Sequence, residues 1–244
     1  MYKVLQYFFS VLFYICFGSL LLIFHVLQWI ALKGMGYNAH KNVVDIMNLL
    51  ILRCLNLLGT RITFENKVSL PLHRPLIFVV NHQSTYDIPP LIWYLRKHHA
   101  KFISKQELGK GIPSVSFNLR HGGSILIDRK NRTKALEKIS AFGKRLAQSN
   151  YAAIIFPEGT RSKDETVKKF QRGGLTILME SMPTALMVPI RVWNSWKLAQ
   201  YKYFPFPLGV HLKNIITGAN NQMLTAANSA NVNKNAISLE NHAQ

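Results

Sequence analysis

The feature that most constrains this sequence is an uncharged stretch near its amino-terminal end. From Val4 to Leu32 there is no Asp, Glu, Lys or Arg, and Lys3 and Lys33 bracket the run. About 20 predominantly apolar residues are enough for a helix to cross the hydrocarbon core of a bilayer. We therefore expect this stretch to form a membrane-embedded helix.

The same stretch is compatible with more than one arrangement. A cleaved signal peptide is disfavoured, because the run is longer than the usual apolar region of such peptides and no small-x-small cleavage site follows it. A spanning helix and a re-entrant or interface-embedded helix both remain open. Polar groups that suit a membrane interface are spread along the run: Tyr7, Tyr14, His25, Gln28 and Trp29.

A second apolar stretch, Val43 to Leu58, follows a glycine-containing break at residues 33–36. This stretch also carries Asp45, Asn48 and Arg53, so it is amphipathic rather than uniformly apolar. We expect residues 1–58 to form a membrane-associated module of two helices. The alternative is that the second helix belongs to the core of the globular part, as its length allows.

From Arg61 onward, short apolar runs alternate with longer amphipathic segments. The runs typical of buried strands are Leu76–Val80, Lys101–Ser104, Ser124–Ile127, Ala152–Phe156 and Leu186–Trp193. The clearest helical pattern covers Thr133 to Gln148. This alternation predicts an α/β fold over residues 59–217, with a mixed sheet covered by helices. Residues 218–244 are rich in Asn, Ala and Ser, and we expect them to form a disordered tail.

The composition indicates an anionic partner. The 244 residues include 30 Lys and Arg against 11 Asp and Glu, a formal net charge of +19, which suits nucleic acid, anionic lipid or an acidic carrier protein. The hydrophobic content of 48% favours lipid, and the dispersed basic residues lack the patterns of nucleic-acid-binding modules. The two cysteines, Cys16 and Cys54, lie in apolar segments and do not indicate a disulfide framework.

His82 and Asp87 follow the strand expected at Leu76–Val80. Ligands of open α/β sheets bind at the carboxyl ends of strands, which is where His82 falls. Pro89 favours the first turn of a helix, so a loop-to-helix turn can bring Asp87 to the imidazole. A carboxylate on one ring nitrogen fixes the tautomer, and the other nitrogen then takes a proton from a hydroxyl. The simpler alternatives are that Asp87 only caps the helix and that His82 is only a hydrogen-bonded core residue. A metal site is less favoured, because no His or Cys cluster shows ligand spacing.

A second polar group, residues 156–162, follows the strand expected at Ala152–Phe156. Its sequence is Phe-Pro-Glu-Gly-Thr-Arg-Ser, in which glycine allows a tight turn and Thr, Arg and Ser bring donors that suit a phosphate. The alternative is an ordinary polar turn with a surface Glu–Arg pair. Lys105 and Arg129 follow two further strand ends. Acidic residues also lie at these ends, namely Asp87, Glu107, Asp128 and Glu158. This gathering favours a shared site over scattered surface charge.

These blocks resemble the motifs of the glycerolipid acyltransferases. The matching segments are Asn81-His82 through Asp87 for the HxxxxD motif, Gly123–Arg129 for the second block, Phe156–Ser162 for the third and Val188–Ile190 for the fourth. The third block matches in full. The resemblance covers about Arg61 to Leu212, and it is closest to the class that acylates 1-acylglycerol 3-phosphate.

The resemblance implies a role for each matching residue. His82 would be the general base on the sn-2 hydroxyl of the acceptor, oriented by Asp87. The glycerol-phosphate end would be held by Glu158, Gly159, Thr160 and Arg161, with Lys105 and Arg129 helping to bind the phosphate. Residues 188–190 would shape the acyl side of the site.

The resemblance also implies the reaction and its setting. An acyl chain would pass from acyl-CoA or acyl-carrier protein to lysophosphatidate, giving phosphatidic acid for phospholipid synthesis, without a metal or other cofactor. The expected partners are membrane lipid and the two substrates, not nucleic acid. The expected location is the bacterial inner membrane, with the catalytic domain on the cytoplasmic side.

Some features leave alternatives open. The acceptor could instead be another lysophospholipid or a lyso-ornithine lipid, and a lipid-binding scaffold without activity is disfavoured by the intact His82 and Asp87. The aromatic, Lys-rich segment from Trp193 to Pro207 matches no motif. We expect it to form either a membrane-facing lip or a covered edge of the domain.

Overall fold

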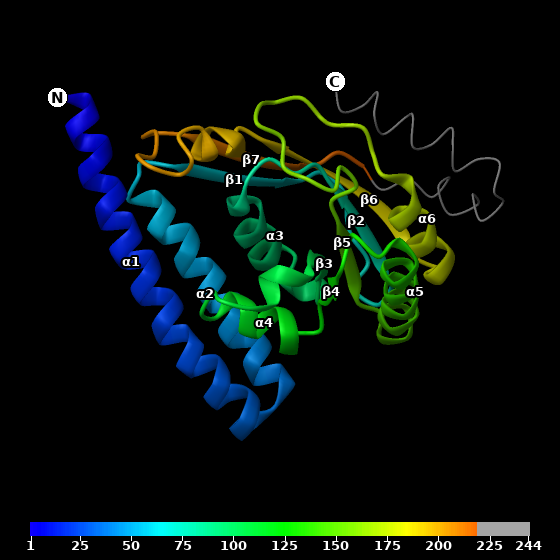
Figure 1. Ribbon diagram of the computed structural model, residues 1–244. Helices are drawn as coiled ribbons and strands as arrows, with labels where there is room; N and C mark the ends of the chain where they lie inside the picture. The colour runs from blue at the N-terminus through cyan, green and yellow to red at the C-terminus, as the bar shows by residue number, and fades with distance from the viewer. Residues whose placement is uncertain (219–244) are drawn as a thin grey trace.

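The computed structural model describes residues 1–218, which form a helical hairpin packed against an α/β domain (Figure 1). The α-helices are α1 Tyr2–Ile30, α2 Tyr37–Asn56, α3 Ile88–Tyr94, α4 Val115–His121, α5 Arg132–Ser149 and α6 Arg172–Ser181. A π-helical turn, η1, covers Ala31–Met35, and short 3₁₀ turns are η2 Thr85–Asp87, η3 Arg96–His98, η4 Gln106–Gly109 and η5 Ser195–Ala199. The strands are β1 Arg61–Asn66, β2 Leu76–Val80, β3 Lys101–Lys105, β4 Ile125–Ile127, β5 Ala152–Ile155, β6 Leu186–Trp193 and β7 His211–Ile216. Apart from Gly218, the expected tail at 218–244 lies outside the described residues.

The described strands make one seven-stranded mixed sheet in the order β1-β7-β6-β2-β5-β3-β4. Strands β6, β2, β5, β3 and β4 run parallel to one another, while β7 is antiparallel to β6 and β1 is parallel to β7. The carboxyl ends of the five parallel strands therefore lie along the same edge of the sheet. We call this the carboxyl edge.

Strand β2 shows why helices cover both faces of the sheet. All five of its side chains are buried, and they alternate between two clusters. Ile77 and Val79 join the cluster formed with α5 and α6, whereas Leu76, Phe78 and Val80 join the cluster formed with α3. A strand buried on both faces belongs at the centre of a sheet. The expected mixed sheet covered by helices is confirmed.

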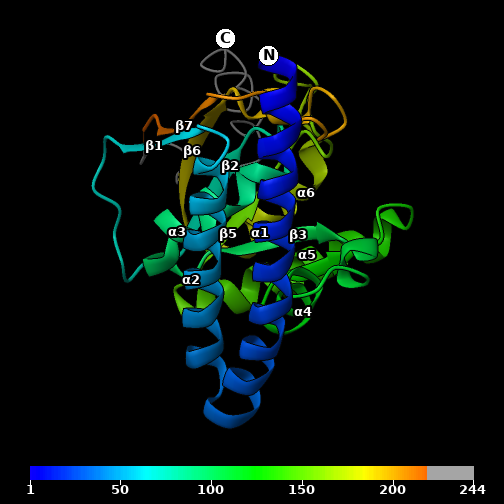
Figure 2. The same ribbon diagram turned by 90° about the vertical axis from the view of Figure 1, so that its left-hand side faces the viewer.

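The hairpin of α1 and α2 turns at the π-helical residues Ala31–Met35 and at Gly36, whose φ of 84° glycine adopts without a steric penalty. Figures 1 and 2 show that this turn points away from the sheet. Helix α2 packs against α1 and also against α3. The second helix therefore belongs to the hairpin and joins it to the domain core as well.

Helix α1 leaves one apolar face uncovered. Exposed side chains recur along it at helical spacing, including Val4, Phe8, Val11, Ile15, Leu22, Val26 and Trp29. By length and composition, the helical stretch Tyr2–Met35 is sufficient to cross a membrane, with a mean hydropathy of 2.3 in its most apolar window. An apolar face of this length marks a membrane or protein contact.

Candidate active site

His82 and Asp87 form a hydrogen-bonded pair at the carboxyl edge. His82 lies two residues after β2, and Asp87 is the last residue of η2. Nδ1 of His82 is 2.8 Å from Oδ2 of Asp87, and the His82 side chain is 19% exposed while that of Asp87 is fully buried. With Nδ1 engaged by the carboxylate, Nε2 is the nitrogen that can accept a proton. The loop-to-helix turn therefore brings together the two residues that the sequence pairs.

Asp87 caps a helical turn, but from the N3 position of η2; as the N-cap of α3, the simpler alternative, its side chain makes no capping hydrogen bond. Ser84 is the N-cap of η2, and its hydroxyl accepts a hydrogen bond from the backbone N–H of Tyr86 at 3.2 Å. Oδ2 of Asp87 accepts the backbone N–H groups of Ser84 at 3.0 Å and Gln83 at 2.7 Å. This reciprocal arrangement is a capping box, which fixes the start of a helical turn. Capping and orientation of the imidazole therefore depend on the same carboxylate.

The turn after β5 holds the backbone of His82 from two sides. Oε1 of Glu158 accepts the N–H of His82 at 2.7 Å, and the N–H of Ser162 donates to the carbonyl of His82 at 2.7 Å. Oε2 of Glu158 accepts the N–H of Lys168 at 3.0 Å. Burial raises the pKa of Glu158, against the opposing effect of these two N–H donors. The ring of Phe156 stacks on the imidazole, with centroids 4.1 Å apart. Glu158 thus positions the His82 loop rather than pairing with the arginine.

Two arginines contact this turn and the loop beside it. Nη1 of Arg129 donates to the carbonyl of Gly159, whose φ of 70° is left-handed and favours glycine. Nη1 of Arg161 donates to the hydroxyls of Thr85 and Tyr203, each at 2.7 Å. Guanidinium groups at this edge suit a phosphate, because they offer several donors in a planar fork.

The remaining predicted residues are exposed at the same edge. Lys105 ends β3, and it pairs in register with Ile127, the last residue of β4, two positions before Arg129. Thr160 is exposed in the turn between Gly159 and Arg161. The strand order thus brings to the carboxyl edge the residues predicted from sequence to act as the base or to hold the phosphate, whereas residues 188–190 lie in the middle of β6. Within residues 1–218, no three His, Cys, Asp or Glu side chains are grouped as metal ligands would be.

Other residues of this site were missed by the sequence reasoning. Ser195 follows the carboxyl end of β6, and its hydroxyl donates to Oδ1 of Asp87. Its N–H donates to Oε1 of Gln83 at 3.1 Å. The side chain of Asn81 exchanges two hydrogen bonds with the backbone of Val192, at 2.9 and 2.6 Å. The signal was available for Ser195, because it follows a strand end as His82 does.

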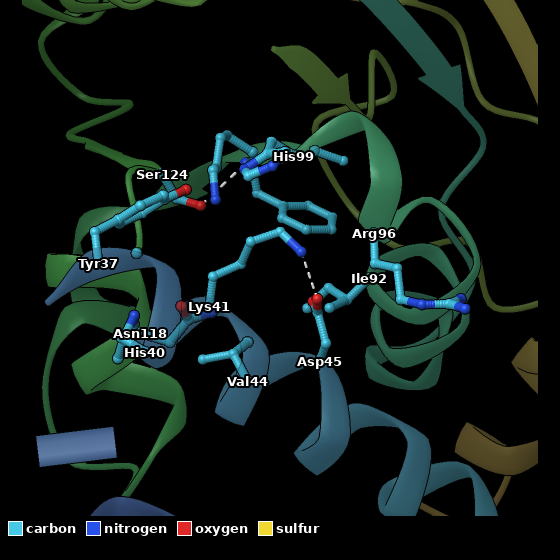
Figure 3. Close-up of a pocket in the computed structure, with 14 residues that line it drawn as sticks. Tyr37, His40, Lys41, Val44, Asp45, Ile92, Arg96, His99, Asn118 and Ser124 are labelled. Atoms are coloured by element: carbon cyan, nitrogen blue, oxygen red, sulfur yellow. Dashed lines mark hydrogen bonds and ion pairs between the residues drawn. The ribbon is translucent and has the colours of Figure 1, made fainter. Parts of the chain in front are cut away.

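A separate pocket of about 30 Å³ lies between α2, α3 and the start of β3 (Figure 3). Lys101, the first residue of β3, is buried there, with its ammonium 5.1 Å from the ring centroid of Tyr37. Burial lowers the pKa of Lys101 to about 8 and that of the fully buried His40 to about 4. Beside them, Lys41 pairs with Asp45 at 2.5 Å. This pocket lies at the opposite end of β3 from the carboxyl edge.

Comparison with known proteins identifies the family. Residues 61–193, more than half of the chain, match the sequence model of the family described as Acyltransferase. The chain therefore belongs to the acyltransferase family, as its motifs indicate.

Two relatives and one solved structure show the extent of the similarity. The chain is 36% identical over 134 residues to the 1-acyl-sn-glycerol-3-phosphate acyltransferase of Helicobacter pylori, covering 52% of this chain and 54% of that protein. It is 27% identical over 176 residues to the alpha enzyme of the same name from Ovis aries, covering 72% of this chain and 59% of the relative. The chain thus spans about half the length of these curated relatives. The crystal structure of the 1-acyl-sn-glycerophosphate (LPA) acyltransferase PlsC from Thermotoga maritima has the same fold. Its TM-score is 0.79 at 22% identity, over 100% of this chain and 96% of that one.

Proposed function

We propose that this protein is a membrane-bound 1-acyl-sn-glycerol-3-phosphate acyltransferase. It transfers an acyl chain from a thioester to the sn-2 hydroxyl of the acceptor and gives phosphatidic acid. The observation that carries the proposal is the pairing of a partly exposed His82 with a buried Asp87, beside a turn that contains Arg161 and is contacted by Arg129. The names of the curated relatives support this choice of acceptor.

The proposed mechanism depends on which nitrogen of the His82 imidazole carries the proton. With Nδ1–H donating to Asp87, Nε2 takes the proton of the sn-2 hydroxyl as its oxygen attacks the thioester carbonyl. The new ester forms, the carbon–sulfur bond breaks, and the imidazolium returns its proton to the leaving thiolate. Asp87 stabilises the imidazolium between these steps. Because the donor is already activated, the reaction requires no covalent enzyme intermediate, metal or other cofactor.

The acceptor phosphate is placed by the basic groups of the same edge. Arg161, Arg129 and Lys105 supply positive charge, and Gly159 and Thr160 shape the turn between the arginines. Glu158 acts through the backbone of His82. The residues 188–190 of β6 lie beside β2 and support the apolar core under the site.

The uncovered face of α1 and the net charge of +19 support a membrane location. We place the protein on the bacterial inner membrane, with residues 59–217 on the cytoplasmic side, where acyl-CoA or an acidic acyl-carrier protein is the donor. Basic residues near an anionic surface contribute about 1 kcal/mol each. Flotation with phosphatidylglycerol vesicles is expected to recover the protein, with weaker recovery on phosphatidylcholine. Equal recovery would exclude the electrostatic part of this proposal.

The reaction is tested with detergent-purified protein, lysophosphatidate and either acyl-CoA or acyl-carrier-protein donors. His82→Ala is expected to lose about 10²–10⁴-fold in turnover, because the general base is removed. His73→Ala is the matched control, since His73 is exposed in the loop before β2. Circular dichroism and thermal unfolding establish that both variants are folded.

Each other outcome has a definite meaning. Turnover that survives in His82→Ala would keep the reaction and exclude the mechanism. Faster turnover of a different lysophospholipid or of a lyso-ornithine lipid would show that this lipid, and not lysophosphatidate, is the acceptor. No turnover with any of these acceptors and either donor would exclude acyltransferase activity.

A further inference from the structure

The segment between β6 and β7, residues 194–210, is fastened to α1. The Phe206 side chain is fully buried, and its ring centroid lies 5.0 Å from that of Phe13 in an edge-to-face contact. The backbone N–H of Phe206 donates to the hydroxyl of Ser10 at 2.8 Å. The hydroxyl of Tyr14 donates to the carbonyl of Tyr203 at 2.7 Å. This segment, whose part up to Pro207 matched no sequence motif, is therefore packed against α1 through Phe206 and Tyr203, while Tyr201 and Phe204 remain exposed.

The same segment reaches the carboxyl edge through Tyr203. Its hydroxyl accepts a hydrogen bond from Nη1 of Arg161, which also donates to Thr85, and the two hydroxyls are 3.4 Å apart. The three side chains come from η2, the turn after β5 and the segment after β6. Tyr203 has a φ of 70°, a region that a bulky residue adopts only when its surroundings hold it there. The ring is held by Tyr86 and Phe206, at centroid distances of 6.0 and 6.5 Å.

This contact bears on the site because Arg161 is next to the catalytic loop. The following residue, Ser162, donates its N–H to the carbonyl of His82, and Thr85 lies between His82 and Asp87. The hydrogen bonds from Arg161 to Thr85 and Tyr203 both use Nη1, and a guanidinium has further donors on Nη2 and Nε. An arginine held in one orientation loses less side-chain entropy when it binds an anion.

We propose that Tyr203 is a positioning residue for the acceptor, whose hydroxyl, together with that of Thr85, holds the Arg161 guanidinium toward the phosphate monoester. The proposal rests on the proposed function. It makes the 194–210 segment part of the acceptor site and connects that site mechanically to α1. Tyr203 acts through Arg161, so its contribution is to acceptor affinity and not to the proton transfer at His82.

The test is Tyr203→Phe, which removes the hydroxyl and keeps the ring contacts. We expect KM for lysophosphatidate to rise about tenfold, the usual scale for one lost hydrogen bond to a charged group. The kcat and the KM for the acyl thioester are expected to stay within about twofold of wild type. Thr85→Val, which removes the other hydroxyl and keeps the branched shape, is expected to raise the same KM. Tyr201→Phe is the matched control, because Tyr201 is 55% exposed on the same segment.

The outcomes separate this proposal from the assigned reaction. If wild-type protein does not acylate lysophosphatidate, the proposed function fails, and this proposal fails with it. If wild-type protein is active and Tyr203→Phe has the same KM for lysophosphatidate as wild type, only the positioning role is overturned. A fall in kcat with KM unchanged would also overturn it, since the hydroxyl would then act in the chemical step. Thermal unfolding of each variant confirms that the comparison is between folded proteins.

Discussion

At the scale of single residues, both oxygens of the Asp87 carboxylate accept hydrogen bonds from other groups of the protein. Oδ2 accepts the imidazole N–H and two backbone N–H groups, and Oδ1 accepts the hydroxyl of Ser195. A buried carboxylate is tolerated when its oxygens have partners, and losing one donor leaves part of the desolvation cost uncompensated. Ser195 therefore stabilises both the orientation of Asp87 and the packing of β6 beside β2.

Ser195→Ala tests this role. We expect about 1–3 kcal/mol of lost unfolding free energy, because Oδ1 of Asp87 keeps its burial and loses its donor. Turnover is expected to fall about tenfold as the imidazole becomes less well oriented. Ser181→Ala is the matched control, a buried serine on α6 that bonds to Ser140 and the carbonyl of Ile177. Urea unfolding in mild detergent and initial rates measure the two effects. Equal losses of activity in the two variants would remove any special role for Ser195.

At the scale of elements, the contact between α1 and the 194–210 segment is built on Phe206. Its ring packs among Phe13, Tyr86 and Tyr203, which come from three parts of the chain. Phe206→Ala is expected to cost about 3–5 kcal/mol of unfolding free energy, because it leaves a cavity in a fully buried cluster. Tyr201→Ala, on the exposed side of the segment, is expected to change it by about 0.5 kcal/mol or less. Similar losses in both variants would show that the segment does not depend on this cluster.

The elements also show what the sequence can and cannot predict. The five apolar strands and helix α5 were predicted within one or two residues, because a short apolar run and an apolar face at helical spacing are strong local patterns. Strands β1 and β7 were missed. They alternate polar and apolar residues, and β1 finds its partner about 150 positions away, with Arg61 opposite His211.

The same distinction separates the site residues. The His82–Asp87 pair and the 158–161 turn were predicted, because each is contained in a short motif after a strand. Ser195 and Tyr203 were not, since their roles arise only when β6 is inserted next to β2 and when Arg161 turns toward the segment. The position after a strand end is the one local indication for Ser195, and the role of Tyr203 has no local indication.

At the scale of the whole molecule, the two ends of the sheet have different electrostatic character. The carboxyl edge presents exposed cations around His82, whereas the pocket at the start of β3 contains the buried Lys101 together with Lys41 and Arg96. Burial first, and then the charges of Lys41 and Arg145, lower the pKa of Lys101, while Asp45 opposes this effect. The division into residues 1–58, 59–217 and 218–244 stays a prediction. The structure shows that the first of these parts is packed onto the second.

The pH dependence of the unfolding free energy tests whether the pKa of the buried Lys101 is lowered. Its pKa is about 8 in the folded protein against 10.5 for an ordinary lysine, so between these values the unfolded chain holds a proton that the folded chain releases. Unfolding then takes up a proton, and the unfolding free energy rises with pH. From pH 8 to 10 this contribution amounts to about 2 kcal/mol.

Lys101→Met keeps the apolar stem and removes the titrating group. We expect this variant to be more stable than wild type at pH 7, with the difference shrinking by about 2 kcal/mol between pH 8 and 10. Comparing the two proteins cancels the opposing changes at Tyr37, whose pKa burial raises to about 12, and at Cys54, whose pKa burial also raises. Lys144→Met, at an exposed position on α5, is expected to differ from wild type by a constant amount. A difference for Lys101→Met that does not change with pH would show that Lys101 keeps an ordinary proton affinity, and that water reaches its ammonium in the folded protein.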